Sequence, residues 1–167
     1  MTKEILGLSS PHQTLLVCTS GTIDMMGKKR KIDNIITIDW HMPVSFNPPL
    51  YCISVGKNRF SLKLIRHSRC FSVNFMSHEY EKALVFCGVN SGVNVDKFKE
   101  TKLTKVECIK IDTNYVKEAE SVYECEVVDE IEAGDHVIFV GKIIHSQKHD
   151  DKRRILNTNK GFTTTMK

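Results

Sequence analysis

Residues 34–49, NIITIDWHMPVSFNPP, bring hydroxyls, amides, a carboxylate and the chain's single tryptophan, Trp40, into one short segment. The consecutive prolines Pro48 and Pro49 indicate a turn that joins two strands. Polar groups crowded in this way need hydrogen-bond partners or a ligand, which makes the segment a candidate binding site. A structural alternative is equally open, in which Trp40 and Phe46 only plug one end of a barrel.

A second candidate segment, residues 54–61 (SVGKNRFS), spans the predicted end of a strand and the predicted start of a helix. Ser61 is the candidate N-cap of that helix, and Lys57 and Arg59 place two cations beside it. A phosphate needs free N–H donors, a favourable helix dipole and a charge-assisted arginine contact. The segment therefore predicts an anion site, and an ordinary capped helix with exposed basic residues is the alternative.

Short β-like segments with helical segments inserted between them must position both candidates, which predicts a mainly β barrel or sandwich with added helices. Branched, aromatic or alternating patterns predict strands over residues 14–20, 50–55, 70–75, 123–131 and 136–145. Apolar residues three and four apart predict helices over residues 61–67 and 79–86. Gly141 in the middle of the last strand indicates a bulge or a close backbone approach.

The composition is that of one ordinary soluble domain. A chain of 167 residues, 41% hydrophobic and 26% charged, can form a core without disulfides or a structural metal. The formal net charge of +4 is too small to predict a nucleic-acid-binding protein by itself. Two basic runs, residues 28–31 and 152–154, are interpreted as solvated turn or edge charges.

Six scattered cysteines form no CxxC pair and no Cys/His spacing typical of a zinc site. Four of them lie in apolar, strand-like runs, which predicts buried free thiols and a reducing cytoplasm: Cys18, Cys52, Cys70 and Cys125. The sequence shows no secretory signal and no apolar stretch of membrane-spanning length. We therefore expect a cytoplasmic protein without a metal site or a membrane partner.

Several common catalytic patterns are missing from the sequence, namely GxGxxG, GxxxxGK, GxSxG and HExxH. Their absence disfavours a Rossmann dinucleotide site, a P-loop, a serine hydrolase and a zinc protease. His78 and Glu79 are adjacent, but the second histidine of a zinc-binding helix does not follow them.

Taken together, the order and spacing of these motifs resemble the flavin-reductase-like family, whose members, flavoredoxins included, bind FMN in a split β-barrel. The matching positions are residues 11, 14–20, 34–49, 54–61, 71–74, 86–88, 91–92, 96–98, 125, 134–136, 156–157 and 161–164. The resemblance implies one FMN-binding domain over residues 1–167. It also implies a homodimer with the pocket near the subunit boundary.

The resemblance assigns site residues position by position. The isoalloxazine ring would be bordered by Thr37, Ile38, Asp39 and Trp40. The phosphate end would be held by Ser54, Val55, Lys57, Arg59 and Ser61. An Asp-Lys-Phe element would close over the flavin through Lys97 and Phe98. His136 lies in a Gly-Asp-His turn that either borders the flavin or only organises the hairpin, and Cys87 holds the Cys-Gly position near the pocket.

The function that the resemblance implies is an FMN-binding oxidoreductase. Flavin performs the redox step itself, so no catalytic side chain is predicted. Electrons would pass from NAD(P)H or a reduced electron-transfer protein, through FMN, to an acceptor. One alternative is a flavoredoxin-type carrier without its own nicotinamide reaction. Another is a basic nucleic-acid-binding barrel that uses residues 28–31, although the main hypothesis includes no nucleic-acid partner.

Overall fold

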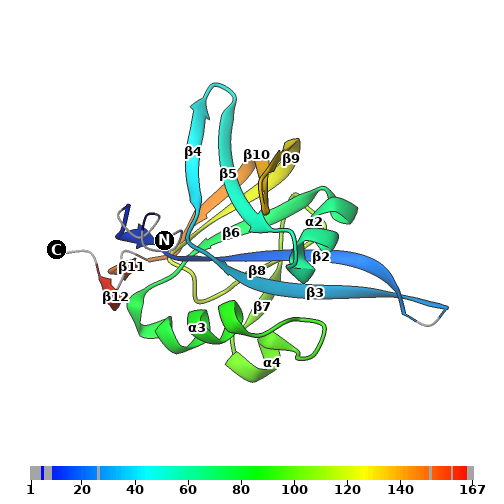
Figure 1. Cartoon of the computed structure of the whole chain (residues 1–167), viewed down its shortest axis with the longest axis horizontal. Coiled ribbons are helices and arrows are strands. Elements are labelled where there is room, and N and C mark those ends of the chain that lie inside the picture. The colour runs from blue at the N-terminus through cyan, green and yellow to red at the C-terminus, as the bar shows by residue number, and fades with distance from the viewer. Residues whose placement is uncertain (1–4, 6–8, 26, 151, 159, 165–167) are drawn as a thin grey trace.

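The computed structural model describes residues 5, 9–25, 27–150, 152–158 and 160–164 of the protein. Its elements in chain order are β1 (His12–Gln13), β2 (Leu15–Met25), β3 (Lys28–Ile38), β4 (His41–Phe46), β5 (Pro49–Gly56), α2 (Phe60–Ser68), β6 (Cys70–Phe75), the 3₁₀ helix η1 (His78–Tyr80), α3 (Glu81–Val89), α4 (Lys97–Thr101), β7 (Lys105–Glu107), β8 (Asn114–Val116), β9 (Ser121–Ala133), β10 (His136–Lys148), β11 (Ile155–Thr158) and β12 (Gly161–Thr164). The predicted mainly β architecture with inserted helices is confirmed (Figure 1).

Seven antiparallel strands form the main sheet in the order β3-β2-β6-β9-β10-β5-β4. All five predicted strands are present in it, and several are longer than their apolar patterns indicated. The β2–β3 ribbon, for example, continues to the pair Met25 and Lys28, where the residues are mostly polar. Strands β1, β11 and β12 form a small second sheet, and β7 pairs with β8.

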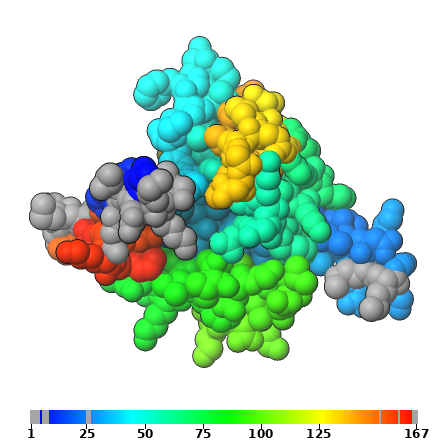
Figure 2. Space-filling model, in the orientation of Figure 1, coloured from blue at the N-terminus to red at the C-terminus, as the bar shows by residue number. Residues whose placement is uncertain are grey.

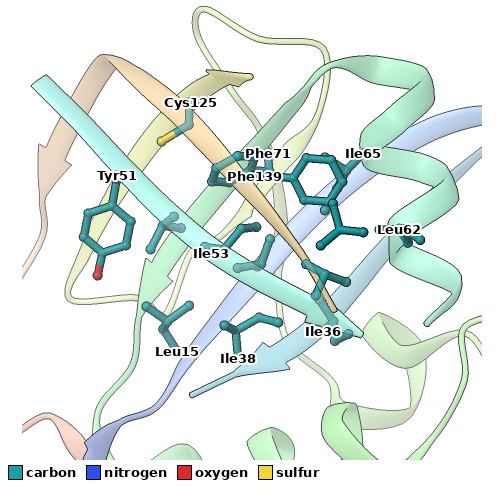
Figure 3. Packing of buried hydrophobic residues seen from close by; sticks show 14 of the residues in the cluster. Leu15, Ile36, Ile38, Tyr51, Ile53, Leu62, Ile65, Phe71, Cys125 and Phe139 are labelled. Carbon is teal, nitrogen blue, oxygen red and sulfur yellow. The ribbon is translucent and has the colours of Figure 1, made fainter. Parts of the chain in front are cut away.

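Two apolar clusters fill the molecule because β2 is buried on both faces. Leu15 and Val17 point into a cluster enclosed by the curved main sheet and α2, part of which Figure 3 shows. Leu16 and Cys18 alternate with them and point into a second cluster beneath α3. A continuous apolar run in the sequence is therefore a strand with two buried faces.

Helix α2 forms over Phe60–Ser68, as predicted, and places Leu62 and Ile65 on the first cluster. The second predicted helix begins later than expected, because residues 78–80 form the 3₁₀ helix η1 before α3 starts. The chain is held at this point by a β-bridge between Ser77 and Arg154 and by a hydrogen bond from the His78 N–H. These contacts favour one tight turn before the α-helix.

Gly141 fulfils both expectations for a mid-strand glycine. The register between β10 and β9 shifts between Val140 and Gly141, which marks a bulge. A Cβ atom at Gly141 would lie 2.6 Å from Cζ of Phe71 and 2.7 Å from Cβ of Cys125. The position therefore has no room for any side chain.

The segment of residues 34–49 contains more structure than one turn. It ends β3 and forms all of β4, and the β4–β5 hairpin extends from the body of the molecule (Figure 2). Phe46 is fully exposed at the hairpin tip and Trp40 is 40% exposed, so the interpretation of these two rings as a barrel plug is wrong. Strand β4 is an edge strand, and Phe46 at its tip is not covered by any described residue.

The charge and cysteine expectations are largely confirmed. Residues 28–31 are exposed at the start of edge strand β3. Arg154 contradicts the solvated interpretation of residues 152–154, because its guanidinium lies 4.5 Å from the ring centroid of Phe75 and bonds Glu120. The four cysteines expected to be buried are buried free thiols. Within the described residues, no helix is long and apolar enough to cross a membrane.

Candidate functional site

A small cavity of about 50 Å³ lies between β3, the N-terminus of α2 and the chain from α3 to α4. We name it the cationic cavity, because Arg59 and Lys97 line it and no carboxylate-bearing residue does so in the described part of the chain. Hydroxyls, amides and backbone make up much of the rest of its wall, including Asn34, Ser61, Asn90, Ser91 and Gly92. This donor-rich lining is suited to an anion.

Lys97 brings a buried positive charge to the cationic cavity. Its side chain is only 4% exposed, and Nζ donates to the carbonyl oxygens of Ile35 at 2.9 Å and Cys87 at 2.7 Å. Burial lowers the pKa of Lys97, and no described carboxylate forms an ion pair with it. Two neutral carbonyls thus hold the amine, and in its protonated form a third N–H is left for an anion.

The N-terminus of α2 adds backbone donors to the same cavity. Arg59 is the N-cap residue, in extended conformation, with no side-chain capping bond and no acidic residue in the first turn. The prediction that Ser61 is the N-cap is wrong: Ser61 is already helical, and its Oγ accepts a 2.8 Å bond from Nδ2 of Asn34. The Leu62 N–H already donates to the Arg59 carbonyl. The N–H groups of Phe60 and Ser61, and the exposed Arg59 guanidinium, which forms no ion pair with a described residue, are therefore open to a ligand.

Cys87 lies in the wall of the cationic cavity, as its motif position implied. It is fully buried, and burial raises the pKa of its thiol to about 11. The thiol is therefore protonated at neutral pH and is a poor nucleophile. Nearby, Thr37 Oγ1 donates a 2.5 Å bond to the Leu84 carbonyl, which attaches β3 to α3.

A second, larger cavity of about 390 Å³ lies just beyond the C-terminal end of β3. We name it the apolar cavity, because Trp40, Met42, Cys52 and Ile138 form much of its lining. Asp39 also borders it, but this carboxylate accepts bonds from Thr14 and Asn157, at 2.6 and 2.7 Å. The Asp39 carboxylate therefore helps to hold the small second sheet in place through these hydrogen bonds.

His41 borders the apolar cavity as a neutral side chain. Burial lowers the pKa of His41. Its Nε2 lies 2.7 Å from the carbonyl oxygen of Gln13, which can only accept a hydrogen bond. Nε2 therefore carries the hydrogen, and Nδ1 accepts from the Tyr51 hydroxyl at 2.6 Å. This pair of His41 and Tyr51 could not be predicted, because a single histidine beside a tryptophan has no distinctive spacing.

His136 is brought beside the predicted ring-binding segment. Its ring centroid lies 4.8 Å from that of Trp40, and Nδ1 lies 2.7 Å from a carboxylate oxygen of Asp135. This hydrogen bond lowers the pKa of Asp135. His136 therefore both contacts Trp40 and organises the β9–β10 turn, so its two predicted roles are compatible.

The structure divides the predicted site residues among several places. Arg59, Ser61 and Lys97 meet at the cationic cavity. Asp39, Trp40 and Ser54 meet at the apolar cavity. The side chains of Ile38 and Val55 belong to the first core cluster, so only their backbone is available to a ligand.

Two predicted side chains are engaged elsewhere. Lys57 Nζ lies 2.5 Å from a carboxylate oxygen of Glu132, and the Lys57 N–H donates to the Asp135 carbonyl. Phe98 packs against the second core cluster. Conversely, Asn58 and Asn90 line the cationic cavity without having been predicted as site residues, although Asn58 lies in the candidate segment 54–61. Asparagines in connecting segments are too common to predict a site.

The two cavities are arranged for one elongated ligand. Ile36 lines the cationic cavity and Asp39 borders the apolar one, and three residues of extended chain span about 10 Å. Such a ligand would have an anionic end and an uncharged, flat end. The described residues that line the two cavities are suited to binding and orientation, and none of them is an activated nucleophile.

Comparison with known proteins identifies the class. The model of the flavin reductase like domain matches residues 8–166, and the chain belongs to this family. The family binds flavin. An uncharacterized protein of Archaeoglobus fulgidus is 38% identical over 112 residues, which are 67% of this chain and 63% of that protein. An uncharacterized protein of Pyrococcus abyssi is 32% identical over 111 residues, 66% of this chain and 63% of its own length. The matches thus span less than two thirds of these relatives.

Solved structures share the split-barrel fold. A flavoredoxin from Methanosarcina acetivorans superposes with a TM-score of 0.79 at 24% identity, covering 94% of this chain and 86% of that one. An NADH:FAD oxidoreductase of Streptomyces globisporus gives a TM-score of 0.82 at 22% identity, covering 99% and 92%. The predicted fold and family resemblance are therefore confirmed.

Proposed function

We propose that this chain is a flavin-dependent oxidoreductase that binds FMN with its phosphate in the cationic cavity. The charge of that cavity is the observation that supports the proposal most directly. Arg59 and Lys97 line it without a described carboxylate among them, so a phosphate dianion would neutralise both. The open N-terminus of α2 adds backbone donors on the same side.

The isoalloxazine ring would extend along residues 37–40 toward the apolar cavity. The two cavities are about 10 Å apart along β3, which suits a ligand with a phosphate at one end and a flat ring at the other. Neutral His41 presents no charge to the ring, and the Asp39 carboxylate accepts hydrogen bonds from Thr14 and Asn157. The apolar side chains of this cavity can therefore contact an uncharged aromatic system.

FMN supplies the hydride and electron chemistry when it is bound. The residues of this chain bind and orient it: Arg59 and Lys97 hold the phosphate, which fixes the position of the ring. Trp40 and Ile138 are apolar walls that limit water at the ring. Cys87 stays a neutral thiol and takes no part as a nucleophile.

NAD(P)H is the proposed electron donor, with a reduced electron-transfer protein as the alternative. One structural neighbour is an NADH:FAD oxidoreductase, which supports a nicotinamide donor, whereas another neighbour is a flavoredoxin. The nucleic-acid alternative is not retained. Lys31 is already paired with Asp112, and Asp33 follows the basic run after one residue, so carboxylates partly compensate the charge of residues 28–31.

We further propose that residues 1–167 act as one domain, in the cytoplasm, as a homodimer. The support for a second copy is the apolar character of the exposed β4–β5 hairpin, where Met42, Val44 and Phe46 all face solvent. Exposed apolar side chains on one projecting element are typical of an interface. The support for a cytoplasmic location is the set of buried free thiols.

The test is an FMN titration followed by anaerobic reduction. We expect the protein to bind FMN and to shift its visible absorption, and a spectrum unchanged by added protein would refute the proposal. The loaded protein is then mixed with NADH and, separately, NADPH without oxygen. Bleaching on a catalytic timescale supports the oxidoreductase, whereas flavin that stays oxidised with both donors identifies the flavoredoxin-type carrier.

A further inference from the structure

Gly92 and the side chain of Asn34 close one side of the cationic cavity, which both residues line. A Cβ atom at Gly92 would lie 2.2 Å from Oδ1 and 2.7 Å from Cγ of Asn34, and the three atoms nearest to it all belong to this amide. The backbone of Gly92 therefore packs directly against the amide of Asn34. Together they form a wall that leaves no opening for a ligand.

Asn34 is held firmly in this wall. The residue is only 4% exposed, and its Nδ2 donates to Oγ of Ser61 at 2.8 Å. Its backbone is fixed as well, because Asn34 is paired with Thr19 between β3 and β2. A ligand that pushed the amide aside would break a buried hydrogen bond, which is costly. We therefore expect the amide to keep its place when a ligand enters the cavity.

Unused space lies beyond the wall. A third cavity, of about 620 Å³, also has Gly92 in its lining, together with Arg30 and Phe98. We name it the outer cavity. Asn34 lines the cationic cavity but not the outer one. Space and a cation are thus present next to the cationic cavity, and the contact between Gly92 and Asn34 separates them from it.

The cationic cavity is matched in size to a single phosphate. One buried water needs about 10–15 Å³ of cavity. A volume of about 50 Å³ therefore holds about four groups of that size, which is enough for the terminal oxygens of one phosphate. Two linked phosphates need more space than the closed cavity offers.

The charge of the cationic cavity also matches a terminal phosphate. Arg59 and Lys97 line it, and no carboxylate does so among the described lining residues. A phosphate monoester such as that of FMN carries a charge of about −1.5 to −2 at neutral pH. Each phosphate of a diphosphate bridge has a single ionised oxygen, so it neutralises two neighbouring cations less completely. The pair of cations therefore favours FMN over FAD.

We propose that Asn34 and Gly92 make the chain selective for FMN over FAD, because they close the side of the cationic cavity through which a second phosphate would have to pass. The inference rests on the proposed function, since the flavin phosphate must first lie in this cavity. FMN fills the cavity with its terminal oxygens. FAD has to leave its diphosphate at the mouth, beside the exposed Arg59 guanidinium, where solvent screens the contact.

The test measures FMN and FAD affinities by calorimetric titration for the unaltered protein, for Asn34→Ala and for the double variant Asn34→Ala/Gly92→Ala. We expect the unaltered protein to bind FMN about ten times more tightly than FAD. Asn34→Ala removes the amide from the wall and should reduce this preference to about threefold or less, by strengthening FAD binding.

The double variant should restore the preference for FMN. The atoms nearest to a Cβ at position 92 are those of the Asn34 amide, so in the double variant the new methyl group occupies the space that the amide has left. The φ angle of Gly92 lies outside the left-handed region, and alanine therefore fits the backbone there. A wall rebuilt from a different side chain separates the effect of closure from the effect of losing Asn34.

Asn90→Ala is the matched control. Asn90 also lines the cationic cavity, but it does not line the outer cavity, and its Nδ2 donates to the Phe86 carbonyl. This variant enlarges the cavity without opening the wall, so the ratio of FMN to FAD affinity should stay within about twofold of the parent value. Urea unfolding shows which variants are folded, and Asn34→Ser replaces Asn34→Ala if the latter is not.

The outcomes separate this inference from the proposed function. If neither flavin binds to the unaltered protein, the proposed function itself fails. If the unaltered protein binds FMN and FAD equally well, the selectivity is refuted while FMN binding stands. The role of Asn34 is refuted if Asn34→Ala leaves the preference unchanged, or if Asn90→Ala lowers it by the same factor.

Discussion

Replacing Arg59 with alanine is expected to weaken FMN binding about tenfold while riboflavin, which lacks the phosphate, binds as before. A charge-assisted hydrogen bond to phosphate contributes about 1.5–3 kcal/mol. Arg59 is exposed at the mouth of the cationic cavity, so solvent screens the contact and the lower end of this range applies. A loss of about 1.4 kcal/mol corresponds to a tenfold rise in Kd.

The assay is a fluorescence titration of FMN and of riboflavin with the unaltered protein, Arg59→Ala and the control Lys63→Ala. Lys63 is an exposed cation on α2 that lines neither the cationic cavity nor the apolar cavity. Arg59 has no described ion pair to lose, so the variant should keep the stability of the parent. If Arg59→Ala weakened riboflavin binding equally, the effect would not come from a phosphate contact. If Lys63→Ala weakened FMN binding equally, the effect would come only from the overall charge of the protein.

Three further predictions concern the scaffold of the site. Lys97→Met should lower the free energy of unfolding by about 2–4 kcal/mol, because two buried carbonyls lose their donor, and a urea titration that shows no loss would contradict this role. Gly141→Ala should cost about 1–3 kcal/mol, since a Cβ atom would lie 2.6 Å from Cζ of Phe71, and an unchanged melting temperature would mean that the bulge can relax. For His41, burial lowers the pKa of the folded state below the ordinary 6.5, so the unfolded chain binds the proton first and stability falls as pH decreases through this value. Comparing urea unfolding at about pH 7.5 and about pH 5.5, His41→Gln should lose less stability than the parent, and an equal loss would refute the assignment.

The main sheet is predictable because its strands carry local signals. Residues 70–75 alternate in the sequence, and β6 places Phe71, Val73 and Phe75 in one cluster with polar Ser72 and Asn74 on the other face. The small second sheet carries no such signal. Its first strand is two residues long, and its pairing joins His12 to Asn157, at the opposite end of the chain. A contact of that kind depends on the completed barrel.

The anion site is predictable in its charge but not in its composition. The cations and the helix start in residues 54–61 are local features, and the structure confirms that Arg59 and Ser61 share a cavity. That Lys57 turns away instead depends on Glu132, on a strand 75 residues later in the chain. Ser61 likewise lacks its expected capping role because α2 already begins at Phe60, and its hydroxyl instead accepts a bond from Asn34 of β3.

Long-range ion pairs of this kind also explain why the cationic cavity keeps an uncompensated positive charge. Several exposed cations pair with carboxylates: Lys57 with Glu132, Arg66 with Glu130, and Lys152 with Glu79. Lys97 donates only to neutral carbonyls. Burial lowers the pKa of Lys97, and the nearby charge of Arg59 lowers it further. Two uncompensated cations near each other cost stability in the empty protein, and a bound dianion relieves that cost. The fold therefore leaves two uncompensated cations at the place where a flavin phosphate would bind. The stability that the empty protein loses there is recovered as affinity for the phosphate.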